Sequence, residues 1–110
     1  MSEPGYLLTE AAEADLRDII RYTRKQWGSA QVRRYITALE RGLVRLAARE
    51  GVYQDMSDLY PALYMAHCEH HYLFCLPREK MPALIVAIFH ERMDLMARVA
   101  DRMQSRKDQG

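Results

Sequence analysis

The sequence predicts an α+β domain in which an N-terminal helical hairpin packs on a small, mostly antiparallel sheet. Two observations predict this fold. Apolar residues recur at helical spacing up to about residue 51, and short aromatic and β-branched runs follow from residue 60 onward. The expected order is strand, two helices, three strands and a short C-terminal helix. A helical hairpin that covers a sheet is a stable layered arrangement.

The first half of the chain is expected to hold one short strand and two helices. Residues 6–9 form an apolar run that can make the strand, and Thr9 can then cap a helix over 10–27. Gly28 is expected to end that helix, because glycine tolerates the left-handed conformation found at helix ends. Ser29 is expected to cap a second helix over 30–50.

The second half is expected to hold three strands, over 60–67, 71–76 and 83–90. The last of them, ALIVAIFH, is an almost unbroken apolar run, which is typical of a central strand covered on both faces. Asp94 can cap a terminal helix over 93–103. The whole chain is expected to form a single domain, 1–110, with residues 104–110 as a flexible polar tail.

Composition limits the classes of protein to which the chain can belong. Sixteen Lys and Arg oppose fifteen Asp and Glu, so the net charge of +1 gives no strong attraction to nucleic acid or membrane. The longest apolar run is far too short to span a bilayer, and the N-terminus lacks the pattern of a signal peptide. Two cysteines without export predict free thiols and a cytoplasmic location.

The stretch HCEHH at 67–71 has the composition of a metal site. A structural zinc site, however, usually takes its four ligands in spaced pairs, and no second pair is near. A turn is also expected between the two strands, with Cys68, Glu69 and His70 at its tip. We therefore expect a hairpin tip with partly exposed imidazoles, and neither a metal nor a cofactor.

The stretch HERMD at 90–94 begins like the zinc-protease motif H-E-x-x-H. Asp94 stands where the second histidine should be, and the stretch follows a strand instead of lying inside a helix. Because two ligands four residues apart share a face only on a helix, this stretch does not predict a metalloprotease.

Four stretches together resemble the RelE/ParE superfamily of bacterial toxins from type II toxin–antitoxin systems. The stretch from Tyr6 to Gly28 is similar to the family's first strand and helix, and the helix after it matches in length and spacing. The phrases DLYPAL and HYLF are similar to its central strand pair, and IVAIFHERMD to its closing strand. The resemblance covers residues 6 to about 103 and implies a cognate antitoxin as partner.

Two departures favour the ParE-like branch over the RelE-like branch. Many relatives have arginine where this chain has Tyr64, and Tyr-Arg where it has Cys75 and Leu76. A ribosome-dependent RNase needs several cations around the scissile phosphate as well as an acid–base group. The resemblance therefore implies a toxin that inhibits DNA gyrase by protein binding, with no catalytic residues. The alternative is a RelE-like mRNA endoribonuclease.

Seven residues are candidates for contacts with these partners. The target-binding candidates are His90, Arg92, Asp94, Met96 and Met103, and the antitoxin-binding candidates are Trp27 and Tyr35. Several have a second, purely structural interpretation. His90 can be a hydrogen-bonded residue that ends a strand, and the methionines can be the inner stripe of the last helix. Trp27 and Tyr35 are expected to pack within the helical hairpin, with their edges open to an antitoxin.

Overall fold

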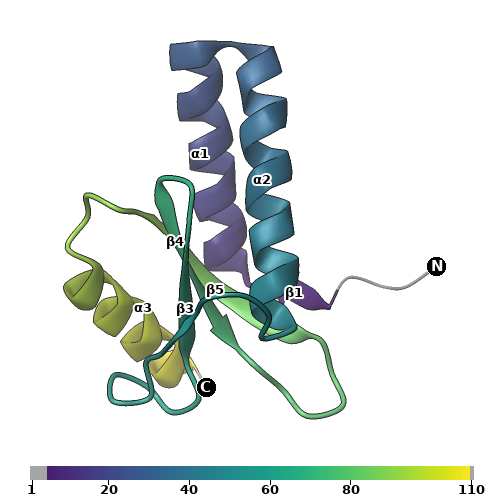
Figure 1. Cartoon of the computed structure of the whole chain (residues 1–110). Coiled ribbons are helices and arrows are strands. Elements are labelled where there is room, and N and C mark those ends of the chain that lie inside the picture. Colours follow the sequence, from purple (N-terminus) through teal and green to yellow (C-terminus); the bar gives the residue numbers. More distant parts are fainter. Residues whose placement is uncertain (1–4, 110) are drawn as a thin grey trace.

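A five-stranded sheet with helices on both faces is the frame of this protein (Figure 1), whose computed structural model describes residues 5–109. The elements in chain order are β1 (Tyr6–Leu8), α1 (Glu10–Trp27), α2 (Ser29–Ala47), β2 (Gln54–Asp55), β3 (Tyr64–Cys68), β4 (His71–Leu76), β5 (Ala83–His90) and α3 (Leu95–Gln109). The strand order is β1-β5-β4-β3-β2. In the part of the chain that the structure describes, β1 and β5 pair in parallel and the other three pairs are antiparallel. The predicted α+β class is confirmed.

The helical hairpin begins and turns at two capping residues. Thr9 precedes α1, and its Oγ1 accepts a hydrogen bond of 3.1 Å from the Ala12 N–H, as predicted. Gly28 has a φ of 87° and donates its N–H to the Arg24 carbonyl, so it ends α1. The same glycine directly precedes α2. The prediction that Ser29 caps α2 is wrong, because Ser29 is already the first residue of that helix.

Several element boundaries differ from the predicted ones, and one short strand was not predicted. Helix α2 stops at Ala47 instead of residue 50, and Arg49 already lies in the left-handed region with a φ of 57°. Strand β3 starts at Tyr64 instead of residue 60. Pro61 has no N–H to donate, and Ala62 has a φ of 67°, so neither continues a strand. The two-residue strand β2 was not predicted, because both of its residues are polar and exposed.

Helix α3 also differs from its predicted range of 93–103. It begins at Leu95, and Asp94 caps it as predicted by accepting a long hydrogen bond of 3.5 Å from the Ala97 N–H. It then continues through Gln109, so most of the tail predicted over 104–110 is helical. Residue 110 lies outside the described residues.

The sheet separates two apolar clusters. One lies between the sheet and the α1–α2 hairpin, and its buried members include Ala12, Ile19, Leu39, Leu43, Leu46, Leu73, Ile85 and Ile88. The other lies between the sheet and α3, and its buried members include Leu63, Phe74, Val86, Ala87, Phe89, Val99 and Met103. Strand β5 contributes to both clusters, as expected for a central strand covered on both faces.

A β-bulge in β5 is held by an ion pair between α1 and α3. Phe74 pairs with Ala87 but the next residue, Cys75, pairs with Ile85, so Val86 is the extra residue. The Val86 carbonyl accepts a hydrogen bond of 2.9 Å from the Arg102 guanidinium. Arg102 also binds both carboxylate oxygens of Asp15, at 2.9 and 3.0 Å. Asp15 in turn accepts the Ile88 N–H at 3.0 Å, so one pair connects α1, β5 and α3.

Candidate functional site

The candidate site is the corner where β5 leads into α3, residues 90–96, which we call the β5–α3 corner. His90 ends the strand, and its side chain and backbone shape the turn that follows. Its Nδ1 accepts the Arg92 N–H at 3.1 Å, and its carbonyl accepts the Met93 N–H at 3.0 Å. His90 is thus a hydrogen-bonded residue at a strand end, which was the structural interpretation of the sequence.

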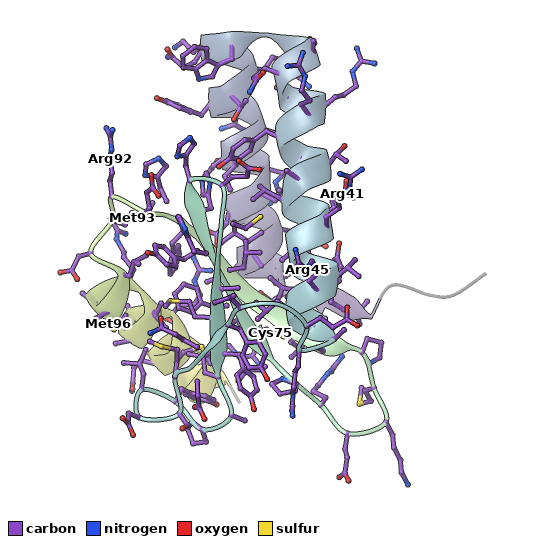
Figure 2. All side chains as sticks on the ribbon, viewed as in Figure 1. Arg41, Arg45, Cys75, Arg92, Met93 and Met96 are labelled. Atoms are coloured by element: carbon purple, nitrogen blue, oxygen red, sulfur yellow. The ribbon has the colours of Figure 1, made fainter. Side chains whose placement is uncertain are left out.

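The corner presents a surface of charged side chains of both signs and methionines. Arg92 and Asp94 are exposed, and Met96 is 45% exposed. Met93, which lies between them, is also exposed. Figure 2 shows Arg92, Met93 and Met96 together at the side of the molecule where α3 begins, with Arg92 extended away from the ribbon. The exposed side chains of the corner are therefore one cation, one carboxylate and two thioethers.

Met103 does not belong to this surface. Its side chain is only 3% exposed and packs with Val99 in the cluster beneath α3. The residues predicted to bind the target therefore fall into an exposed group and a buried one. Arg92, Asp94 and Met96 lie on the surface, whereas Met103 belongs to the inner stripe of the helix.

The HCEHH stretch forms the tip of the β3–β4 hairpin and contacts the corner. The Glu91 carboxylate joins His67 Nε2 at 2.8 Å and His70 Nδ1 at 3.1 Å. The backbone is linked as well, because the Glu91 N–H donates to the His70 carbonyl at 2.9 Å. Hydrogen bonds from His67 and then His70 lower the pKa of Glu91. The tip of the β3–β4 hairpin is therefore joined to the corner through Glu91.

Tyr35 and His71 form a second, more buried link at the same place. The Tyr35 hydroxyl accepts the His70 N–H at 3.0 Å and forms a hydrogen bond of 2.6 Å with His71 Nδ1. The His71 ring stands edge-on to the His90 ring at a centroid distance of 5.2 Å. Burial, followed by the nearby His90 and His70, lowers the pKa of His71 to about 4. His71 is therefore a neutral structural imidazole near pH 7.

These links leave no metal-binding set. One ring nitrogen of each of the three imidazoles, His67, His70 and His71, is hydrogen-bonded to a carboxylate or hydroxyl group. Among residues 5–109, no group of three or more His, Cys, Asp or Glu side chains is arranged to hold a metal ion. Absence of a metal in the purified protein remains a prediction.

A cation, Arg49, lies near Tyr64, one of the sheet positions where many relatives have arginine. The Arg49 guanidinium lies 4.9 Å from the centroid of the Tyr64 ring, and Tyr53 meets the same ring edge-on. The sequence did not indicate this contact, because Arg49 follows the end of α2 and reaches Tyr64 only through its left-handed backbone. Burial raises the pKa of Cys75 to about 11, so its thiol stays protonated.

The two antitoxin-binding candidates lie in different settings. Trp27 is 71% exposed at the far end of the helical hairpin, so the prediction that it packs between the helices is wrong. Tyr35 is partly buried, and its hydroxyl is occupied by the His70 and His71 contacts.

Within the described part of the chain, no helix is long and apolar enough to cross a membrane.

Comparison with known proteins gives the family. A family model described as the ParE toxin of the type II toxin–antitoxin system parDE matches residues 6–95. Toxin ParE of Escherichia coli is 70% identical over 100 residues, which cover 91% of this chain and 97% of that protein. Toxin ParE1 of Mycobacterium tuberculosis is 29% identical over 90 residues, which cover 82% of this chain and 92% of that protein. This chain therefore belongs to the ParE family of toxins of type II toxin–antitoxin systems.

Proposed function

We propose that this toxin inhibits DNA gyrase by binding it through the β5–α3 corner, and that a cognate antitoxin neutralises it. Both partners would meet it in the bacterial cytoplasm. The observation that carries the proposal is the exposed Arg92, Met93 and Met96 surface on a firmly held turn. Arginine is enriched at the energetic centres of protein interfaces, and methionine is enriched at interfaces and adapts its shape to a partner.

The hydrogen bonds of the corner favour binding over RNA cleavage. Cleavage needs a free acid–base group and cations aimed at the phosphate. Here His71 is engaged by Tyr35, His90 accepts the Arg92 N–H, and Glu91 engages the other two histidines. The second candidate function is a RelE-like endoribonuclease. It is favoured by one observation, the gathering of imidazoles beside the exposed Arg92.

Inhibition of gyrase by purified toxin tests the proposal. Arg92→Ala combined with Met96→Ala should raise the toxin concentration for half-maximal inhibition of supercoiling at least tenfold, because interface anchors contribute more than about 1 kcal/mol each. Arg41→Ala with Met81→Ala is the matched control. Both residues are exposed, and Arg41 projects from α2 on the other side of the molecule (Figure 2). The control should inhibit like the unaltered toxin.

Two outcomes would contradict this part of the proposal. One is equal inhibition by both double variants and the unaltered toxin, which would remove the corner from the gyrase contact. The other is cleavage of mRNA in the ribosomal A site with supercoiling untouched, which would replace gyrase binding by the RelE-like activity. Circular dichroism of each variant establishes that the fold is retained.

The antitoxin is proposed to lie along α2 and the free edge of β1. Among residues 5–109, strand β1 pairs with β5 alone, and the proposed antitoxin segment would add a strand at its other edge. Beside this edge, α2 presents Val44, Arg41 and Arg45 around an open groove, whose lining also includes one carboxylate, Glu40. The apolar side chain and the two cations suit a partly disordered partner with apolar and acidic residues that orders itself on binding.

A charge reversal on α2 tests this surface. Val44→Glu with Arg41→Glu should weaken the toxin–antitoxin complex at least tenfold in calorimetric titration and leave gyrase inhibition unchanged. The matched control, Met81→Glu with Arg98→Glu, makes the same replacements at exposed positions elsewhere and should bind normally. Equal weakening by both pairs would place the contact elsewhere. A chain that is harmless when expressed alone and binds no product of a neighbouring gene would refute the partnership.

A further inference from the structure

We propose that the far end of the α1–α2 hairpin binds the phosphodiester backbone of duplex DNA without sequence preference. The six cations concerned, which we call the hairpin cations, are Arg17, Arg21, Arg24, Lys25, Arg33 and Arg34. Such a contact is additional to the gyrase contact at the β5–α3 corner and requires neither gyrase nor antitoxin.

Charge is strongly segregated along the chain. Residues 19–39 carry five Arg and Lys and not one Asp or Glu, although the net charge of the whole protein is only +1. The remainder of the chain therefore carries an excess of negative charge. The small net charge of the whole chain therefore does not reveal a basic segment, which covers the end of α1, the turn at Gly28 and the first half of α2.

The fold places this segment away from the rest of the molecule. In Figure 1 the hairpin extends past the sheet, and the turn between α1 and α2 is its most distant point. All six hairpin cations are exposed, and every residue from 24 to 30 is exposed. The cations thus line a protrusion that can approach a large partner without obstruction from the sheet.

The hairpin cations are almost free of acidic partners. Arg21 approaches the Asp18 carboxylate at 3.7 Å, and both side chains are about four-fifths exposed, at 80% and 76%. Such a pair contributes little and opens readily. The other five hairpin cations form no ion pair within the described part of the chain. Their charge is therefore available to an external anion.

The spacing along α1 suits a row of phosphates. Arg17, Arg21 and Arg24 follow one another at helical intervals of four and three residues, and with Lys25 they surround an open hollow on that face. At a rise of about 1.5 Å per residue the row is roughly 12 Å long. One strand of duplex DNA presents a phosphate about every 3.4 Å along its axis, so this length corresponds to three or four phosphates.

The uniform positive charge of residues 19–39 favours nucleic acid over protein as the partner that binds the far end of the hairpin. Tyr22 and Trp27 are also exposed here, and exposed aromatic residues suit either class of partner. Protein surfaces, however, mix both signs of charge, and lysine is depleted at their interfaces. Only a polyanion complements a segment of 21 residues that contains no carboxylate. Duplex DNA is such a polyanion, with one negative charge about every 1.7 Å along its axis.

Fluorescence anisotropy with the full-length toxin and a labelled 20-base-pair duplex of arbitrary sequence tests the proposal. Four phosphate contacts give a salt slope of roughly −3.6, so affinity should fall about a hundredfold between 50 and 200 mM salt. Arg21→Gln with Arg24→Gln should lower affinity at 50 mM at least tenfold and reduce the slope by about 2. The control Arg41→Gln with Arg98→Gln removes the same charge at exposed sites elsewhere. It should change affinity less than threefold.

Several results would overturn the proposal. They are no binding of the duplex at 50 mM salt, an equal loss in the hairpin and control variants, and tighter binding of single-stranded RNA or polyglutamate than of the duplex. The equal loss would mean that net charge alone governs binding, and the last would assign the segment to RNA or to an acidic protein. Gyrase is absent from the assay, so its outcome is independent of the gyrase proposal.

Discussion

Replacing Arg102 with methionine should cost far more stability than breaking the exposed Asp18–Arg21 ion pair on α1. Methionine keeps the aliphatic length of arginine but loses the hydrogen bonds to Asp15 and to the Val86 carbonyl. The Asp15 side chain is 15% exposed and that of Arg102 21%. The variant therefore leaves a largely desolvated carboxylate without its counter-charge, and a bulge carbonyl without its donor.

The expected loss follows from that burial. Removing one partner of a fully buried pair costs about 3–5 kcal/mol. Because both side chains retain some solvent contact, we expect about 2–4 kcal/mol. That is a large part of the roughly 5–15 kcal/mol that stabilises a domain. In thermal unfolding it corresponds to a decrease in Tm on the order of 10–20 °C.

The assay is urea unfolding followed by circular dichroism, with the Asp18–Arg21 pair as the matched control. That pair lies one turn along α1, with a separation of 3.7 Å and both side chains mostly exposed. Arg21→Met should therefore change the free energy of unfolding by less than about 1 kcal/mol. In a double-mutant cycle, Asp15→Asn and Arg102→Met should show a coupling energy of at least about 1.5 kcal/mol. Losses of similar size for Arg102→Met and Arg21→Met would refute the reasoning.

Three other predictions concern the sheet and its hairpin-facing side. Burial lowers the pKa of His71 from 6.5 to about 4, so unfolded chains take up a proton that folded chains do not. Stability should therefore fall between pH 6.5 and 4 by at most about 3 kcal/mol, and urea unfolding of His71→Gln should show a shallower pH dependence. Gly42→Ala should destabilise by about 1–3 kcal/mol in the same assay, although alanine favours helices, because its Cβ would lie 2.6 Å from Cys68 Sγ. Burial raises the pKa of both Cys68 and Cys75, so iodoacetamide at pH 7.5 should label them much more slowly in native than in denatured protein, as read by mass spectrometry.

The sequence predicted those elements that carry their own periodicity. Helix α1 spans Glu10–Trp27, and strands β4 and β5 span His71–Leu76 and Ala83–His90, all as expected. Strand β2 was missed because two exposed polar residues have no pattern, and they form a strand only because β3 lies beside them. The far end of α3 was missed for a related reason. Its last residues are polar on every side, so amphipathic spacing does not mark where the helix stops.

The uneven distribution of charge was not predicted, for a different reason. A net charge of +1 indicated no attraction to nucleic acid, since a total carries no information about position. The hairpin separates the basic segment in space as well as in sequence, because Gly28 reverses the chain and places the ends of α1 and α2 side by side. The relevant quantity is the net charge of each exposed element. For residues 19–39 it can be counted from the sequence, because this segment contains no Asp or Glu.

The β-bulge decides which residues meet at the candidate site. Near the turn, Leu76 pairs with Leu84, and continuing that register would place His71 opposite Phe89. The extra residue Val86 shifts the rest of β5 by one position, so His71 instead pairs with His90. A one-residue shift also reverses the faces of a strand.

The shifted register directs Ile88 toward the helical hairpin and Phe89 toward α3. His90 thereby stands beside the ring of His71, on the face where the Tyr35 hydroxyl reaches the sheet, and from there it shapes the Arg92 turn. Nothing in ALIVAIFH marks Val86 as the residue that bulges. The position is held by Arg102, which is distant in the sequence, binds the freed Val86 carbonyl and pairs with Asp15. The histidines at 67–71 and the strand end at 90 could each be identified from sequence, but their meeting depends on a contact between the two ends of the chain.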